Sequence, residues 1–239
     1  MTVESDNGSE IVCCRNARCR QQLRIPAGEM LQVTCPTCQT SFTHRPGQPG
    51  KRLSDEFQMK AWTLAELLLA ISRESMMLIK RQAPALSNLP RKQEWEGFIE
   101  VLKILFDLTD RVATLYVPVN EYLLFLDAVE DAVIDQMNAA FRKQAGPDYD
   151  DVPLKISISA AFEDSQKFYQ PHRFMITEEG AEKDKYLKAF GDALAGKLGA
   201  RGNNTIVTTA TMCAGSCIAA IKALMESAEG RSSSPTGMA

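Results

Sequence analysis

Apolar side chains recur every three or four positions from Ser54 onward, which is the spacing of one buried stripe on an amphipathic helix. In the first such segment, Ser54 precedes two acidic residues, as at a helix N-terminus, and Ala83-Pro84 interrupts the pattern. We therefore expect one long helix over about 54–83. Its apolar stripe consists of Trp62, Leu64, Leu67, Leu68, Ile71, Met76 and Ile79.

Two more segments show the same period, one from about Arg91 to Tyr116 and one from about 121 to 143. Pro118 separates them, and Asn120 can cap the second. One face of the second segment carries the carboxylates Asp127, Glu130, Asp131 and Asp135. Such a row can hold a cation or receive a basic partner, but a solvated helix face is the simpler interpretation, and we favour it.

The region that follows predicts two more helices. Residues 154–159 alternate as in a strand, yet Leu154, Ile158 and Phe162 also form a helical stripe, and we choose the helix. A helix over about 178–198 begins after Thr177 and ends before Gly199, because threonine caps helix starts and glycine terminates helices.

A last helix is expected over about 205–227, and its composition is unusual. Ile206–Ile221 carries no charge and is rich in small residues. A helix that is apolar all round is normally buried, so we expect it in the middle of a bundle. Cys213 and Cys217, four positions apart, are interpreted as small core residues rather than as ligands or a redox pair. The fold class that follows is mainly α, with an all-α bundle of about six helices.

A different pattern precedes this region. Residues 30–34 and 40–43 read as short strands around Cys35-Pro36-Thr37-Cys38, and five of the seven cysteines lie within residues 11–43. Cys14-x4-Cys19 and Cys35-x2-Cys38 provide two turns with two thiols each. Four thiolates from two turns suit the tetrahedral coordination of zinc. A module of this size buries too little apolar surface to fold alone, so the metal would supply the missing stability.

These residues resemble a zinc ribbon, a family built from two cysteine knuckles on short antiparallel strands. The resemblance covers residues 11–44 and implies a structural Zn2+ held by Cys14, Cys19, Cys35 and Cys38. The first knuckle is longer than usual, and Arg20 and Gln39 stand where the family often has glycine. Cys13 can replace Cys14, and His44 is a further candidate ligand, although four thiols suffice without it. A disulfide is less favoured because the cysteine count is odd and no signal peptide is evident.

The predicted organisation has five parts: a disordered tail at 1–10, the ribbon at 11–44, a linker at 45–53, an α-helical domain at 54–228 and a disordered tail at 229–239. Residues 11–52 carry seven arginine or lysine residues against Glu29 alone. This basic segment can contact nucleic-acid phosphates or an acidic protein partner. The candidate contacts are Arg15, Arg18, Arg20 and Arg24.

Catalytic motifs are scarce. The chain has two histidines, His44 and His172, and we find no Gly-rich phosphate loop, nucleophile elbow or HExxH motif. His172, with Tyr169 and Glu163 nearby in sequence, can act as a base, but nothing in the spacing selects it. Enzymatic activity is therefore uncertain, and a non-enzymatic role is favoured.

The functional hypothesis is a zinc-ribbon protein whose helical bundle acts as a protein-interaction or adaptor module. The alternatives are a nucleic-acid-associated regulatory factor that uses the basic ribbon, and an enzyme located in the helical domain. We expect a protein partner, a possible homodimer, no membrane insertion and a cytoplasmic location, since no run of 18 apolar residues and no targeting sequence is evident.

Overall fold

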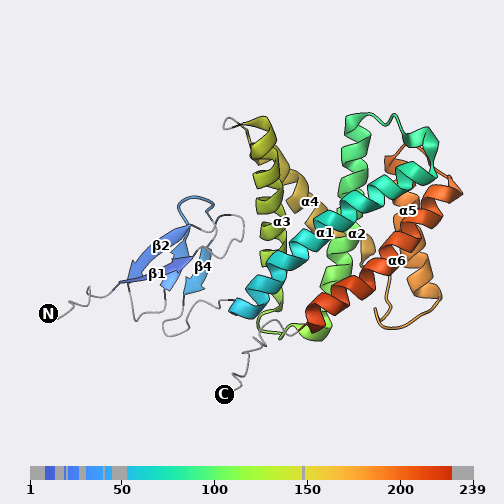
Figure 1. The fold of residues 1–239 in the computed structure, drawn as a ribbon. Helices are drawn as coiled ribbons and strands as arrows, with labels where there is room; N and C mark the ends of the chain where they lie inside the picture. Colours follow the sequence, from blue (N-terminus) through green and yellow to red (C-terminus); the bar gives the residue numbers. More distant parts are fainter. Residues whose placement is uncertain are drawn as a thin grey trace, which may run out of the picture. The chain divides into compact units, whose positions relative to one another are not determined.

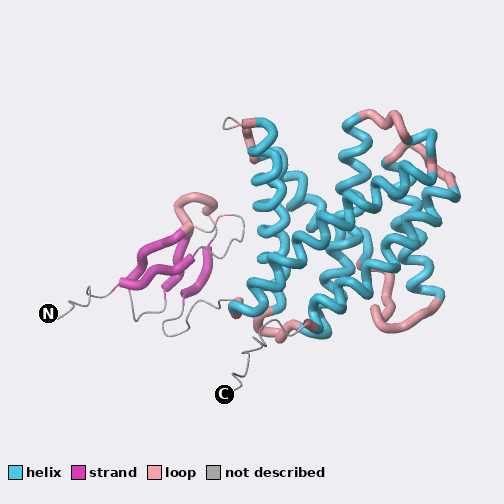
Figure 2. Tube along the Cα trace, in the orientation of Figure 1, coloured by secondary structure: helices cyan, strands magenta, loops and turns pink. Residues whose placement is uncertain are grey.

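The structure of the chain is a computed structural model that describes residues 9–13, 19, 21–26, 31–39, 41–44, 53–146 and 149–227. For residues 9–13, 22 and 41–44 the backbone alone is described. The chain divides into two compact units, and the boundary falls between Leu53 and Ser54. The N-terminal unit consists of strands and the second unit of helices (Figure 2), so each is described by itself.

Two antiparallel hairpins form the N-terminal unit. Strand β1 (Ser9–Cys13) pairs with β2 (Gln22–Pro26), and β3 (Leu31–Thr34) pairs with β4 (Ser41–His44). Residues 9 and 10, which the sequence placed in a disordered tail, belong to β1 instead. Ile25 is buried, and Leu23, Leu31 and Val33 are half-buried. The predicted tails at 1–8 and 229–239 and linker residues 45–52 lie outside the described residues.

The helical unit contains six α-helices in its described residues (Figure 1). They are α1 (Asp55–Gln82), α2 (Arg91–Tyr116), α3 (Tyr122–Ala145), α4 (Val152–Tyr169), α5 (Ala181–Lys197) and α6 (Asn204–Glu226), with a short 3-10 turn η1 (Pro84–Leu86) between α1 and α2. The α2 helix packs against all the other helices of the unit, and α1 lies between α3 and α6. The mainly helical fold class and the helix at 152–169 are thereby confirmed.

Helix ends differ in how well the sequence located them. Asn203 caps α6, because its side-chain oxygen accepts from the backbone N–H groups of Thr205 at 3.0 Å and Ile206 at 3.3 Å. Gly199 ends α5 in the left-handed region, at a φ of 70°. Two predicted caps are wrong: α5 begins after Gly180 rather than Thr177, and α3 begins after Glu121 rather than Asn120.

Ser54 occupies the N-cap position of α1, but its side chain makes no capping bond. Its backbone N–H instead donates to Glu121 Oε2 at 2.9 Å, which joins the starts of α1 and α3. The predicted apolar stripe of α1 is largely buried, with the exception of Trp62, which is 46% exposed. This indole lies at the edge of the stripe rather than inside it.

The largest departure from expectation concerns α6. Its apolar composition predicted a central helix, yet α6 packs on α5, α1 and α2 and leaves its other side open. Only 33% of its most apolar window is buried, and Met212 is 70% exposed. By length and composition alone α6 is apolar enough to cross a membrane. Its small residues allow close packing on one side, but nothing within the described helical unit covers the other.

Candidate metal centre and apolar groove

Three thiols meet in the N-terminal unit. The Sγ atoms of Cys19, Cys35 and Cys38 all lie within 4.8 Å of one another, and those of Cys19 and Cys35 are 3.5 Å apart. Four sulfurs around one zinc at ~2.3 Å stand roughly 3.8 Å from one another, so this spacing fits three corners of the tetrahedron. The described cysteines form no disulfide. The three side chains can therefore bind a metal ion.

The backbone of the second knuckle brings two of these thiols together. Cys35 follows β3 and is fully buried, and Cys38 lies three residues further along the turn. The turn closes through a bond from the Gln39 backbone N–H to the Cys35 carbonyl at 2.9 Å. Gln39 adopts a left-handed φ of 59°. Position 39 thus has the backbone conformation that glycine favours.

Hydrogen bonding and burial act in opposite directions on Cys19. A backbone hydrogen bond from Gln21 lowers the pKa of its thiol, but burial and the neighbouring thiols of Cys35 and Cys38 together raise that pKa. A dication bound among the sulfurs would lower the pKa of each thiol, because each thiolate would then face a positive charge. The cluster is therefore suited to a bound cation.

The structure tests the first knuckle only in part. Cys14 lies outside the described residues, and Cys13 ends β1 with its side chain undescribed. The fourth ligand therefore stays a prediction, with Cys14 and Cys13 as the alternatives. His44 ends β4, and its side chain is likewise undescribed.

Of the predicted basic contacts, Arg15, Arg18 and Arg20 lie outside the described residues. Arg24 is described on β2, where its side chain is exposed. The role of the four arginines in contacting nucleic acid or an acidic partner therefore stays a prediction.

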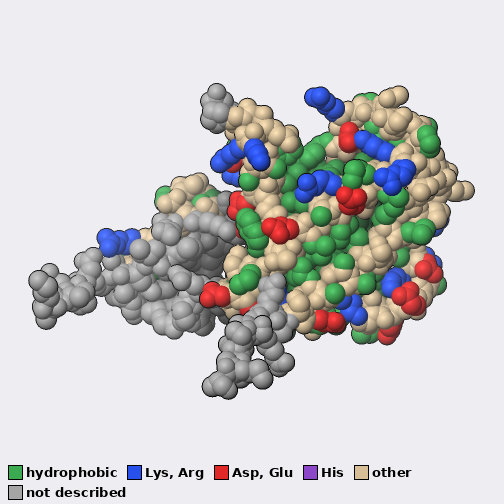
Figure 3. Space-filling view, in the orientation of Figure 1, with side chains coloured by type: hydrophobic (Ala, Val, Ile, Leu, Met, Phe, Trp, Pro, Cys, Tyr) green, Lys and Arg blue, Asp and Glu red, His purple; other side chains and the backbone are tan. Residues whose placement is uncertain are grey.

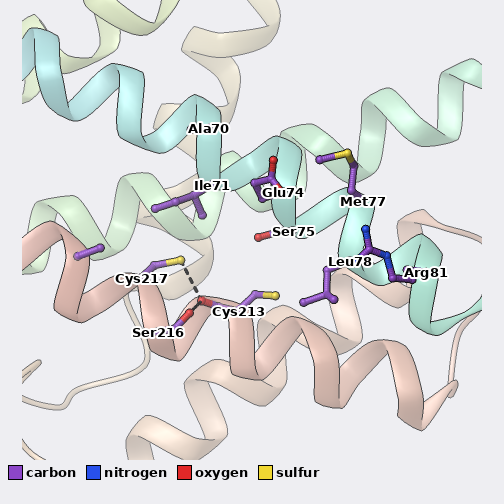
Figure 4. Close-up of a pocket in the computed structure, with 11 residues that line it drawn as sticks. Ala70, Ile71, Glu74, Ser75, Met77, Leu78, Arg81, Cys213, Ser216 and Cys217 are labelled. Atoms are coloured by element: carbon purple, nitrogen blue, oxygen red, sulfur yellow. Dashed lines mark hydrogen bonds between the residues drawn. The ribbon is translucent and has the colours of Figure 1, made fainter.

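The helical unit carries an apolar groove between α1 and α6 (Figure 4). Its volume is about 410 Å³. Ser75 and Leu78 point from α1 toward α6, and Cys213 and Cys217 face them from α6. Cys217 is buried and donates to the Cys213 carbonyl at 2.9 Å, while Cys213 is half-buried. Burial raises the pKa of both thiols, that of Cys217 to about 11.

This arrangement refines the interpretation of the two cysteines. Cys217 is buried, which fits a role as a small packing residue. Cys213, however, is not a core residue, because it lines an open groove.

A second cavity of about 700 Å³ lies among α2, the end of α4 and residues 174–177. Asp107 in its wall is almost fully buried, and it accepts from Arg111 Nε at 2.6 Å and from the Tyr186 hydroxyl at 2.8 Å. Burial raises the pKa of Asp107. Burial and the nearby Asp107 raise the pKa of Asp110 to about 6. Asp110 also accepts a hydrogen bond from the Tyr122 hydroxyl.

Arg111 holds this wall in place. Its Nη2 donates to the carbonyls of Tyr169 at 3.2 Å and His172 at 3.0 Å, and its guanidinium stacks near the rings of Phe174 and Tyr186. His172, which the sequence offered as a possible base without selecting it, contributes its backbone carbonyl here but does not line the cavity. Sequence reasoning missed Asp107, Asp110 and Arg111, whose i, i+3, i+4 spacing within an otherwise buried helix was the available signal.

The acidic face of α3 is only partly solvated. Glu130 accepts from Ser159 Oγ at 2.5 Å, so this carboxylate faces α4. Asp135 is exposed, as expected.

Comparison of the chain with protein-family models, with curated proteins and with solved structures finds no match. The functional argument therefore rests on the residues themselves.

Proposed function

We propose that the N-terminal unit is a zinc ribbon whose metal is structural. The observation that carries this proposal is the convergence of Cys19, Cys35 and Cys38 from two turns onto one point. Thiolates select zinc among abundant divalent ions, and a site made only of cysteines leaves no open position for catalysis. The fourth thiolate comes from Cys14 or from Cys13. A cytoplasmic location suits these thiols, because a reducing compartment keeps them available to the metal.

Elemental analysis tests the metal directly. The purified chain is expected to hold one zinc per molecule, and Cys14→Ser and Cys13→Ser compared side by side identify the fourth ligand as the one whose loss abolishes zinc retention. Purified protein without zinc would refute the ribbon.

We further propose that the helical unit is a protein-binding module and that its binding face is the open side of α1 and α6. Hydrophobic side chains gather over these two helices on the face shown in Figure 3. Met77 and Leu78, which line the groove, are 50% and 36% exposed, and Met212 of α6 is 70% exposed. Exposed apolar surface of this kind often marks interaction sites, and methionine adapts to varied partners. An adaptor role agrees with a structural metal and with a groove that is mostly apolar.

Site-specific photo-crosslinking in cells tests this binding face. A photoreactive residue in place of Met212 is expected to form protein adducts. The same residue in place of Val119, which is 94% exposed but lies away from the groove at the α2–α3 turn, serves as the control. Equal labelling at both positions, or none at Met212, would contradict the assignment.

A further inference from the structure

Two opposite charges stand on the exposed rim of the groove without an ion-pair partner. Glu74 and Arg81 are both exposed on α1, and neither forms a salt bridge with any side chain that the structure describes. They are seven residues apart, which separates them by about 10.5 Å along the helix axis. That distance prevents them from pairing with each other.

The apolar side chains of the face lie between these charges. Met77 and Leu78 occupy the midpoint of the interval from Glu74 to Arg81. In Figure 4, Leu78 points from α1 toward α6, and Glu74, Met77 and Arg81 also line the groove. Along α1 the face therefore presents a negative charge, then two apolar side chains, then a positive charge.

When a second copy of α1 runs antiparallel to the first, its positive end faces the negative end of the first copy, so the two charge patterns are complementary. A twofold axis that crosses α1 between Met77 and Leu78 places a second α1 antiparallel to the first. Glu74 of one copy then meets Arg81 of the partner subunit, and the reciprocal pair forms on the other side of the axis. Met77 and Leu78 meet their counterparts at the centre, and exposed Ala70 at the flank allows close approach. A second copy of the chain already carries the matching charges, whereas a different protein would have to present the same order of charges on its own surface.

We propose that the occupant of the α1/α6 face is a second copy of this chain, bound through an antiparallel α1–α1 contact. The inference rests on the proposed function, since it names the partner of the same face. Apolar burial at the centre supplies the affinity, and the two reciprocal Glu74–Arg81 pairs fix the antiparallel direction. The contact also buries Met77 and Leu78, which are 50% and 36% exposed in the single chain.

A charge-reversal cycle on the full chain tests the proposal, with molar mass in solution measured by light scattering. The wild-type protein is expected at twice the mass of one chain. Glu74→Arg and Arg81→Glu, made singly, each set like charges against each other across the axis and are expected to halve the mass. The double variant E74R/R81E restores both pairs and is expected to return to the dimer. Glu178→Arg, an equal charge reversal at an exposed position outside the face, is expected to stay dimeric.

Met77→Ser adds a test that does not depend on charge, and it is expected to weaken the dimer, with Val119→Ser as the apolar control. Far-ultraviolet circular dichroism checks that each variant is folded. A monomeric wild-type protein, or a dimer that persists unchanged in both single reversals and in Met77→Ser, overturns the proposal. If the chain is monomeric while Met212 still crosslinks to a different protein, the binding face stands and the second copy is the wrong partner.

Discussion

The two units of this protein differ in how much apolar surface their described residues bury. In the described residues, the N-terminal unit buries Ile25 and Cys35, whereas the helical unit buries whole faces of six helices. Burial of one large apolar side chain contributes roughly 1.5–3 kcal/mol, so a unit with so few cannot offset the entropy of ordering its chain. The described core of the helical unit is large, whereas the proposed metal would supply the stability that the described core of the N-terminal unit lacks.

The largest expected effect is the loss of one thiolate from the N-terminal unit, because it should unfold that unit and leave the helical unit unchanged. Cys35→Ser removes the fully buried thiol of the three described in the proposed site, and structural zinc supplies on the order of 10 kcal/mol or more of apparent binding energy. We expect the variant to lose zinc and the N-terminal unit to unfold, while the helical unit keeps its stability. Both tryptophans, Trp62 and Trp95, lie in the helical unit, so thermal unfolding followed by their fluorescence reports on that unit alone.

Cys213→Ser is the matched control for that experiment, since it also removes a thiol but leaves the metal site intact. It is expected to retain one zinc per chain. A Cys35→Ser variant that still holds zinc would contradict the proposed metal site, and one whose tryptophan transition shifts would show that the two units are not supported independently.

The converse test removes core packing from the helical unit. Phe106 is 1% exposed and its ring meets Phe162 edge-to-face at 5.3 Å. Phe106→Ala is expected to cost the helical unit about 3–5 kcal/mol of unfolding free energy, measured by urea titration of tryptophan fluorescence, because a cavity replaces the ring. Zinc content should not change. Phe168→Ala, at a 43% exposed position, should have a much smaller effect.

Local signals made the helical fold predictable where they were unambiguous. The bounds of α2 follow from Pro90 and from the break before Pro118, and Asn203 and Gly199 locate their helix ends because side-chain chemistry and backbone sterics act within a few residues. The start of α5 was missed because Thr177 and Gly180 are both acceptable boundaries. Choosing between them depends on tertiary packing.

Which helices lie next to each other could not be obtained from periodicity. The uncharged face of α6 predicted complete burial, but the sequence does not reveal that one side of a helix will be left without a neighbour. Similarly, Asp107 and Tyr186 are 79 positions apart, and only the packing of α2 against α5 brings them to 2.8 Å. The closeness of Cys35 and Cys38 was easier to predict, because both lie in one four-residue turn.

A third prediction concerns the polar cavity, where the helical unit departs from an apolar core. The pKa of Asp110, about 6, is above the ordinary aspartate value of ~3.9 because the side chain is partly buried beside Asp107. The folded state therefore binds this proton more tightly than the unfolded state. Stability falls as the pH rises from about 4 to about 6 and stays reduced above that range. Asp110→Asn should then stabilise the helical unit near neutral pH.

The expected gain is roughly 1–2 kcal/mol above pH ~6, after allowance for solvent screening, and it should vanish near pH ~4. Urea titrations across this pH range measure it, and the asparagine oxygen can still accept from Tyr122. Exposed Asp135→Asn is the control. An equal effect of Asp110→Asn at both ends of the range would rule out the buried carboxylate as its source.

The smallest effect should come from the backbone of the turn at residues 35–39. It sharpens the contrast between the units because it should act only on the unit that carries the proposed metal site. Gln39 holds a φ of 59° that costs a residue with a Cβ about 1–2 kcal/mol, and glycine avoids this cost. Part of the gain is offset, because glycine also frees the unfolded chain by ~0.4–1 kcal/mol. Gln39→Gly should therefore tighten zinc binding by roughly 0.5–1 kcal/mol, or about two- to fivefold, in competition with a chelator.

Gln39→Ala separates backbone strain from the loss of the side chain. Both variants remove the exposed bond from Gln39 Nε2 to the Pro36 carbonyl at 3.3 Å, but alanine keeps the Cβ in the left-handed region. Alanine should bind zinc no more tightly than the wild type. If alanine and glycine improve the affinity equally, the strain lies in the glutamine side chain rather than in the turn. Neither variant should move the tryptophan transition, since the strain is confined to the unit that the metal stabilises.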